Sequence, residues 1–239
     1  MKKLLLALLA LILVPLTVLA SEGEFHLDHA PDKSADPAAL QNGAKLFVNY
    51  CLNCHSASYM RYNRLRDIGL SDQQIKDNLM FTVDKVGEPM TIAMRRADAK
   101  QWFGVAPPDL SVVARSRTSE AGSGADWLYS YLRNFYRDDS RPSGWNNLVF
   151  ANVAMPHALW QLQGEQVMGE DHKLRLDKPG KLAPAEYDAA VADLVAYLQY
   201  MGEPSARTRK QLGIYVLLFL ALFFVLAYAL KREFWKDIH

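Results

Sequence analysis

The sequence predicts an all-α, loop-rich exported domain that is held to a membrane by a C-terminal transmembrane helix. Three observations support this fold class. Apolar residues recur at helical spacing in a few segments, Gly and Pro are frequent between those segments, and long apolar runs occur near both ends of the chain. Signals for β-strands are few. The stretch between the two runs, 21–204, has a length typical of one domain with a sizeable core.

The first apolar run predicts a signal peptide over 1–20. Lys2 and Lys3 give it a positive start, the run that follows is short and broken by Pro15, and small residues lead up to Ala20 as a cleavage site. A retained N-terminal anchor is the alternative. The run lacks the Arg- and Ser-rich amphipathic pattern of an organelle presequence, which favours a bacterial protein.

The second apolar run, 212–230, carries no charge and predicts a transmembrane helix. At 1.5 Å per residue it spans about 28 Å, close to the hydrocarbon thickness of a bilayer. A buried core helix is the alternative, but the short segment 231–239 cannot surround it. Basic residues flank both ends, so the signal peptide decides the orientation. We expect a single-pass protein of the bacterial inner membrane, with 21–204 in the periplasm, 205–211 as a juxtamembrane linker and 231–239 as a cytoplasmic tail.

Helices are expected at four places in the exported domain. The first runs from Pro37 to Tyr50, with Asp36 as its N-cap and Pro37 at the first helical position. The others are predicted over 71–79 with Ser71 as N-cap, over 126–136 with a cap near Asp126, and over 184–201 with Gly202 and Pro204 as its stop.

The first and last of these helices are expected to cross at close range. Gly43 has no side chain, Phe47 lies one turn further on, and Tyr197 on the last helix is a plausible partner. Two unrelated surface helices are the alternative.

Both cysteines of the chain lie in one segment, CLNCH (51–55), with a histidine directly behind the second. Zinc usually needs four N/S ligands, and no second cysteine pair accompanies this one, although other histidines are available. A redox dithiol of the thioredoxin type follows a strand of a βαβ unit, which the sequence does not show here. A disulfide that closes so short a loop would stabilise little.

The spacing instead favours covalent attachment of a c-type haem. Cys51 and Cys54 would add to the two vinyl groups of one porphyrin, and His55 would reach the iron. Export fits this interpretation, because haem is attached to CxxCH outside the cytoplasm. The domain has long loops and few helices with an apolar face, which is unusual for a domain with only its own side chains to bury. A covalent porphyrin would supply the missing apolar core. The expected fold is therefore a cytochrome c-like haem domain.

The sixth iron ligand separates two classes of function. A Met thioether closes the site and leaves electron transfer, whereas an open iron binds small ligands. Met155 is the best candidate because it lies in a non-helical segment, ANVAMPHAL (151–159, the Met loop), with Pro156 behind it. His157 is the rival ligand there, or else a surface histidine. Met60 is too near CLNCH to cross the porphyrin, and Met201 belongs to the last helix. The remaining candidates are Met80, Met90, Met94 and Met168.

Two haem propionates also need partners. Arg115 and Arg117 follow the segment PPDLSVVA, and a guanidinium suits a carboxylate. A solvated surface arginine is the alternative for each. The overall charge is balanced, with 27 basic and 26 acidic residues, and gives no basic field for nucleic acid.

Together these features resemble the cytochrome c1 family, the haem-bearing subunits of the quinol:cytochrome c oxidoreductase (the cytochrome bc1 complex). The resemblance covers nearly the whole mature chain. CxxCH alone is weak evidence for the family, but the PPDLS segment with its arginines, the single haem motif and the C-terminal anchor are together specific. Four segments carry it: CLNCHSASYMRYNRL, APPDLSVVARSR, VAMP and RKQLGIYVLLFLALFFVLAYALKREFW.

The resemblance implies a role for particular residues. It makes Cys51 and Cys54 the thioether attachments of one haem c, His55 the proximal iron ligand and Met155 the distal ligand.

The resemblance also implies that Arg117 contacts a propionate and that Pro108 packs on the haem. Trp127 stands where the family often has a tyrosine near a propionate, and its indole N–H can still donate. The run Gln101–Phe103 replaces an asparagine-rich run of some members. The additional cysteines that form a disulfide in the family are absent, so packing must hold the Met loop.

In function, the resemblance implies a middle step of electron transfer within a dimeric membrane complex. A Rieske iron–sulfur protein would reduce this haem with an electron from quinol oxidised in a cytochrome b subunit, and the haem would reduce a cytochrome c. A free-standing tail-anchored monohaem carrier is one alternative, and it would co-purify with no b-type haem. A haem enzyme with an open site is another, and its ferrous form would bind carbon monoxide.

Two segments have no settled role. Acidic residues crowd the mature N-terminus and form either a docking face for a basic cytochrome c or a solvated surface; they are Glu22, Glu24, Asp28, Asp32 and Asp36. The polar segment 163–182 separates the Met loop from the last helix, as a surface insertion that covers the haem or meets a neighbour.

Overall fold

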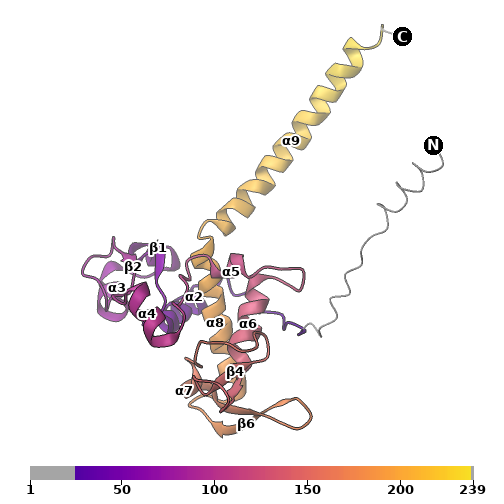
Figure 1. Cartoon of the computed structure of the whole chain (residues 1–239). Coiled ribbons are helices and arrows are strands. Elements are labelled where there is room, and N and C mark those ends of the chain that lie inside the picture. The colour runs from indigo at the N-terminus through magenta and orange to yellow at the C-terminus, as the bar shows by residue number, and fades with distance from the viewer. Residues whose placement is uncertain (1–24, 238–239) are drawn as a thin grey trace, which may run out of the picture.

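The computed structural model describes residues 25–237, which form a largely helical domain with one long helix extending from it (Figure 1). The signal peptide predicted over 1–20, together with Glu22 and Glu24, lies outside the described residues. The longer helices are α2 (Pro37–Leu46), α3 (Asp72–Leu79), α4 (Arg96–Phe103), α6 (Gly124–Arg133), α8 (Pro184–Gly202) and α9 (Ala206–Phe234). Shorter helical turns are η1 (Phe47–Cys51, π-helical), η2 (Tyr62–Ile68, 3₁₀), α5 (Val113–Ser116) and α7 (Trp160–Gln163).

Helix α8 is the centre of the domain and contacts α2, α5 and α6. The predicted close crossing with α2 is confirmed. A side chain at Gly43 would overlap the carbonyl oxygen of Asp193 and lie 2.6 Å from Cβ of Tyr197. The rings of Phe47 and Tyr197 then pack 5.6 Å apart. The glycine therefore lets the two backbones approach, and the aromatic pair closes the contact.

Helix starts follow the expected capping chemistry, with one correction. Ser71 caps α3, and Asp36 accepts hydrogen bonds from the first turn of α2, as predicted. The prediction of a helix over 126–136 capped near Asp126 was wrong at both ends. Ser123 is the N-cap of α6, and Asp126 is the third helical residue, whose carboxylate accepts from the Ser123 N–H at 3.0 Å. The last two predicted residues, Phe135 and Tyr136, belong to a strand.

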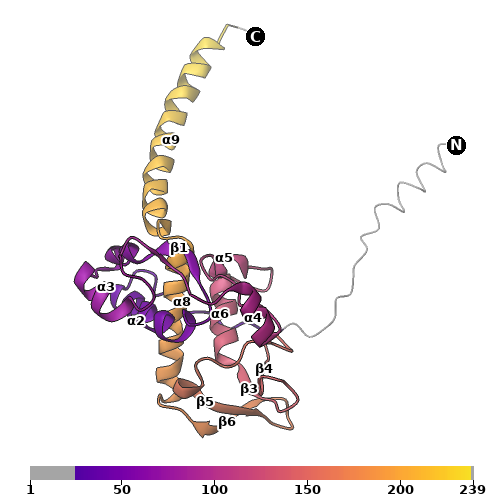
Figure 2. The ribbon, with the colours of Figure 1, turned by 60° about the vertical axis from the view of Figure 1, so that its left-hand side comes forward.

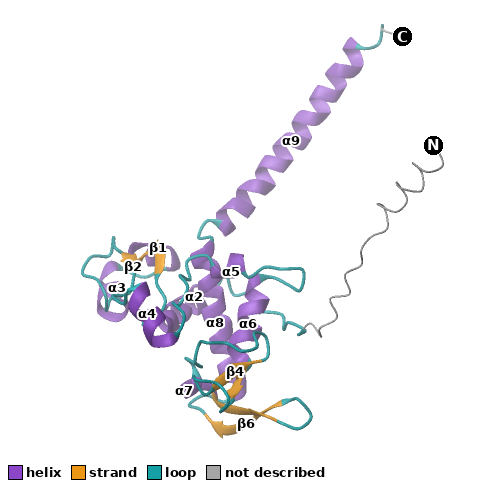
Figure 3. Ribbon diagram, in the orientation of Figure 1, coloured by secondary structure: helices purple, strands orange, loops and turns teal. Residues whose placement is uncertain are grey.

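The all-α prediction is confirmed only in part, because the described residues also form three two-stranded antiparallel sheets (Figure 3). The strands carry no regular alternation of apolar and polar residues, so sequence periodicity does not reveal them. The pairs are β1 (Ala57–Arg61) with β2 (Pro89–Met90), β3 (Phe135–Arg137) with β4 (Trp145–Asn147), and β5 (Gly164–Met168) with β6 (Leu174–Pro179).

The hairpin of β5 and β6 accounts for the polar segment 163–182. It is fixed to the domain by two glutamine side chains. Gln163 and Gln166 each donate to the carbonyl oxygen of Arg133 at 2.9 Å, and Gln166 also donates to that of Phe135. The segment is therefore a structured extension of the domain.

Helix α9 leaves the domain directly after α8 and runs away from it (Figures 1 and 2). It is long and apolar enough to cross a membrane, and none of its residues is buried against the domain. The helix begins at Ala206, so most of the segment expected as a linker, 205–211, is helical. A helical start is favoured because Ser205 follows the stop of α8 and no Gly or Pro interrupts 206–212.

Candidate functional site

The CLNCH segment continues α2 through the π-helical turn η1, so the first helix leads straight to Cys51. The N–H groups of Cys54 and His55 both donate to the carbonyl oxygen of Cys51, at 3.1 and 2.9 Å. This tight turn places two thiols and one imidazole within a single loop. Both cysteines are free thiols.

The surroundings of the two thiols favour their protonated form. Burial raises the pKa of Cys51 to about 12, and burial raises that of Cys54 as well. Reactive and zinc-binding cysteines need the opposite, a stabilised thiolate. Within 25–237, no group of three or more His, Cys, Asp or Glu side chains is placed to hold a metal ion. The described residues thus provide neither a stabilised thiolate nor a third ligand beside the pair.

His55 is buried and oriented for ligation through one nitrogen. Its Nδ1 lies 2.7 Å from the carbonyl oxygen of Pro108, an acceptor, so Nδ1 carries the proton and Nε2 keeps its lone pair. Burial lowers the pKa of His55, which keeps the imidazole neutral, although the hydrogen bond to Pro108 opposes this. Pro108, expected to pack on a haem, thus also positions the histidine through its carbonyl group.

The segment that carries Pro108 is itself fixed against the chain that follows His55. The carboxylate of Asp109 accepts from the N–H groups of Ser58 at 2.9 Å and Ser111 at 2.8 Å. The N–H of Leu110 donates to the carbonyl oxygen of Ser56 at 2.8 Å. The PPDLS segment therefore holds the imidazole in one orientation.

Met155 lies partly buried, and its sulfur accepts a hydrogen bond from the hydroxyl of Tyr131 at 3.4 Å. Among the other methionines, Met90 is fully buried, and its sulfur accepts from Tyr197 at the α2–α8 crossing. Met60 and Met201 are also core residues. Met90 is therefore engaged in the core, whereas Met155 lies in a partly exposed loop.

His157, the rival ligand in the Met loop, is a core residue. Its ring stacks on Phe135 with centroids 4.9 Å apart and packs edge-on against Trp145. The side chain is 2% exposed, and burial lowers the pKa of His157 to about 4. Because the ring lies between two aromatic side chains, it anchors the loop.

Two buried asparagines hold the turn that leads into the Met loop, where the sequence offers no disulfide. The side-chain oxygen of Asn147 accepts from the N–H groups of Val149 at 2.8 Å and Phe150 at 3.2 Å, and its amide donates to the carbonyl oxygen of Tyr131 at 2.8 Å. The side-chain oxygen of Asn146 accepts from the N–H of Asn152 at 2.8 Å. The packing expected for this loop is therefore largely a hydrogen-bond network.

The residues expected at a propionate lie in one row with the methionine. The guanidinium of Arg117 sits 4.3 Å from the ring centroid of Trp127, which stacks on Tyr131 at 4.7 Å. Tyr131 in turn contacts Met155. Arg115 points elsewhere, with its guanidinium 3.9 Å from the carboxylate of Glu203. Of the two arginines, Arg117 is therefore the one beside the other predicted residues.

Two clusters result, and their donor sets fit a covalent haem. One holds two thiols and a neutral imidazole with a free nitrogen, at Cys51, Cys54 and His55. The other holds a thioether sulfur at Met155. Thiols for two vinyl groups and a His/Met ligand pair are what a low-spin electron-transfer haem requires. Tyr131 and Asn147 were not identified from the sequence, since nothing in the spacing linked them to Met155.

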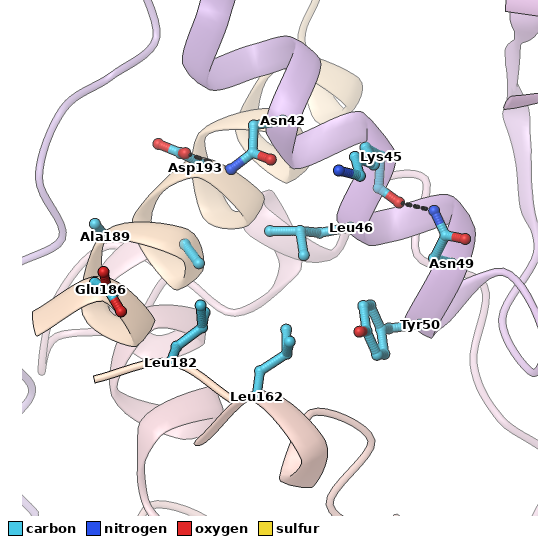
Figure 4. A pocket seen from close by; sticks show the side chains of 11 residues that line it. Asn42, Lys45, Leu46, Asn49, Tyr50, Leu162, Leu182, Glu186, Ala189 and Asp193 are labelled. Atoms are coloured by element: carbon cyan, nitrogen blue, oxygen red, sulfur yellow. Dashed lines mark hydrogen bonds between the residues drawn. The ribbon is translucent and has the colours of Figure 1, made fainter. Parts of the chain in front are cut away.

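A separate groove of about 610 Å³ lies between α2 and α8 (Figure 4). Leu46, Tyr50 and Leu162 line its apolar side. On its polar side, the Asn42 amide donates to the Asp193 carboxylate at 2.7 Å. No predicted site residue lines this groove, so it is distinct from both clusters.

Comparison with known proteins agrees with this geometry. The model of the Cytochrome C1 family matches residues 28–238. The chain is 53% identical to a protein of Nitrosomonas europaea named ammonia monooxygenase gamma subunit, over 97% of both chains. It is 47% identical to cytochrome c1 of Allochromatium vinosum over the full length of both. It is also 28% identical to a Bradyrhizobium diazoefficiens protein named cytochrome b/c1, over 85% of this chain and 34% of that protein.

Proposed function

The chain belongs to the cytochrome c1 family, with one covalent haem c and a place in the respiratory bc1 complex, and from that premise we propose its path of electron transfer. The proposed path runs from the Rieske iron–sulfur protein, through this subunit, to a cytochrome c. The observation that carries the proposal is the pairing of a buried, oriented His55 with free thiols at Cys51 and Cys54. The haem supplies the chemistry when bound, because its iron takes up and releases one electron.

The residues of the chain hold that group in place. Cys51 and Cys54 would attach it, and His55 would bind the iron through Nε2, with its other nitrogen fixed by Pro108. Met155 would supply the second protein ligand. Two such ligands would leave no open position for a small ligand, which would restrict the site to electron transfer.

We assign Arg117 and Trp127 to a propionate. The guanidinium of Arg117 is held over the indole of Trp127, which fixes a positive charge beside the Met155 cluster. A carboxylate near this pair gains a charged partner and an indole N–H donor. Pro108 contributes through its carbonyl, and we expect its ring to pack against the haem.

Helix α9 anchors the domain beside its partners. Basic residues flank the apolar run at both ends, at Arg209 and Lys210 on one side and Lys231 and Arg232 on the other. With a cleaved signal peptide, the haem domain faces the periplasm and the segment after 230 faces the cytoplasm. Cytochrome b is the expected neighbour of α9, since one relative carries both names in a single chain.

The relative from Nitrosomonas europaea has a name that refers to a monooxygenase. That name favours a second candidate, in which the same haem passes electrons to a monooxygenase. The site serves either role, so the partners decide between them.

Purification of the tagged full-length protein from membranes in mild detergent tests the proposal. We expect a reduced-minus-oxidised spectrum with b-type and c-type bands, and quinol-dependent reduction of cytochrome c by the preparation. A c-type band alone, from membranes whose b-type haem stays in other fractions, would contradict it. Co-purification with a monooxygenase in place of b-type haem would favour the second candidate.

The distal ligand needs its own test. Met155→Leu should open the iron, so that the ferrous protein binds carbon monoxide, while Met168→Leu in β5 serves as the matched control. If Met155→Leu still excludes carbon monoxide, another residue is the ligand.

A further inference from the structure

We propose that Tyr131 is a positioning residue for Met155 and that its O–H···S hydrogen bond raises the midpoint potential of the haem. The inference rests on the proposed function, in which Met155 is the distal iron ligand. Its starting observation is the 3.4 Å distance between the Tyr131 hydroxyl and the Met155 sulfur.

The tyrosine is held rigidly enough to act in this way. Its ring stacks on Trp127 at 4.7 Å and meets Phe135 edge-on at 5.0 Å. Its carbonyl oxygen accepts from the buried amide of Asn147 at 2.8 Å. The side chain is 7% exposed, so water offers little competition for the hydroxyl. Among the described residues, the Met155 sulfur is the hydroxyl's hydrogen-bond partner.

The chemistry follows from the two lone pairs of a thioether. One pair can bind iron while the other accepts the O–H group, although sulfur is a weak acceptor. The hydrogen bond draws electron density from the sulfur and makes it a poorer donor. Ferric iron depends on that donation more than ferrous iron does, so the hydrogen bond favours the ferrous state. Hydrogen bonding around the axial ligands is one of the means by which a protein sets a haem potential.

Packing adds a positional effect. Met155 lies in a loop whose neighbours Val153 and His157 are buried anchors, while its own side chain is only partly buried. The Tyr131 hydroxyl gives the thioether a fixed polar contact, which selects one sulfur position. Loss of the hydroxyl therefore changes both the electron-donating strength of the sulfur and how firmly the sulfur is held in one position.

The chain supplies a matched control for this inference. Tyr197 donates to the sulfur of Met90, also at 3.4 Å, inside the crossing of α2 and α8. Tyr197→Phe removes the same group from the same kind of contact, at a methionine other than Met155. It reports the cost of losing a buried hydroxyl without an effect on an iron ligand.

The experiment compares the full-length haem protein with its Tyr131→Phe, Tyr197→Phe and Met155→Leu variants in detergent. The readouts are redox titration of the c-type band, the far-red band of ferric haem bound by sulfur, and carbon monoxide binding. For Tyr131→Phe we expect the ferric-to-ferrous ratio at a fixed potential to rise about two- to fivefold, equivalent to about 20–40 mV at 59 mV per tenfold. Tyr197→Phe should leave the potential unchanged.

The outcomes separate the two claims. If Met155→Leu keeps the far-red band and still excludes carbon monoxide, the proposed ligand is wrong. If Met155 is the ligand and Tyr131→Phe keeps the wild-type potential, or raises it, the inference about Tyr131 is overturned. An equal fall of the potential in Tyr197→Phe would also overturn it. Loss of the far-red band in Tyr131→Phe but not in Tyr197→Phe supports the positioning role.

Discussion

Replacement of Gly43 by alanine tests the crossing that builds the domain. The added Cβ would overlap the backbone oxygen of Asp193 and lie 2.6 Å from Cβ of Tyr197. Neither group can rotate away, so α2 and α8 must move apart by about 1 Å to restore ordinary contact distances. This movement also loosens the ring contact of Phe47 with Tyr197, now 5.6 Å between centroids.

The expected cost follows from two opposing contributions. Overpacking of this kind typically costs about 3 kcal/mol at the upper end of its range, and a backbone clash belongs there. Alanine regains about 1 kcal/mol over glycine in a helix interior. The free energy of unfolding of Gly43→Ala should therefore fall by about 2 kcal/mol. With a denaturant slope of about 2 kcal/mol/M in urea, the midpoint falls by about 1 M.

Urea unfolding of the full-length haem protein, followed by its circular dichroism, measures this change. Gly87→Ala is the control, because nothing lies within 4 Å of a Cβ at that position. If Gly43→Ala unfolds at the wild-type urea concentration, the close crossing of α2 and α8 is wrong.

Three further predictions concern the Met loop and the surface. Asn147→Ala leaves the buried N–H of Val149 and the carbonyl oxygen of Tyr131 without hydrogen-bond partners, so the free energy of unfolding should fall by about 3 kcal/mol. The loosened Met loop should also let carbon monoxide reach ferrous haem. Wild-type stability of this variant would refute the hydrogen-bond network of Asn147. Burial lowers the pKa of His157 to about 4 in the folded protein, so the unfolded chain takes up a proton on this side chain at a higher pH than the folded chain does. The free energy of unfolding should therefore fall by about 3 kcal/mol as the pH drops from about 6.5 to 4. His157→Leu should flatten that part of a pH series of unfolding curves, and an unchanged slope would refute the assignment. Glu165→Gln should cost less than about 1 kcal/mol, although ion pairs lower the pKa of Glu165 to about 2, because its partners Arg137 and Lys178 are exposed to solvent. A larger loss in urea unfolding would contradict this.

Local chemistry explains which parts of the fold could be predicted. Ser71 and Asp36 cap helices through side-chain contacts within three residues, so short sequence motifs identify them. Gly43 could be read as a close-approach position because no other residue suits a helix contact of this kind. The CLNCH segment needs no tertiary partner to be recognised.

The parts that were missed depend on contacts between distant residues. Tyr131 meets Met155 across 24 positions of sequence, and nothing in either local pattern indicates the pairing. The residues around His157 in the sequence are typical of a surface loop, yet Phe135 of β3 and Trp145 of β4 pack against its ring and bury it. Helix α4 was not expected because Ala99 is its one buried residue and leaves no apolar stripe.

Absence of further cysteines gives this chain a distinct way of holding the Met loop. Asn147 ties the start of the loop to α6, and the stacked ring of His157 ties its end to β3. Both anchors flank Met155, so the thioether is constrained from each side without a covalent link. Stability of the iron–sulfur bond should therefore depend on these two buried side chains.

A visible spectrum of the ferrous protein, purified from membranes and recorded before and after carbon monoxide, tests the central claim most directly. We expect one c-type band that survives denaturation with the chain and does not shift with carbon monoxide, because Cys51 and Cys54 would hold the haem and His55 and Met155 would both bind its iron. Absence of a c-type band would contradict the haem assignment, and a band that shifts with carbon monoxide would contradict a closed electron-transfer site.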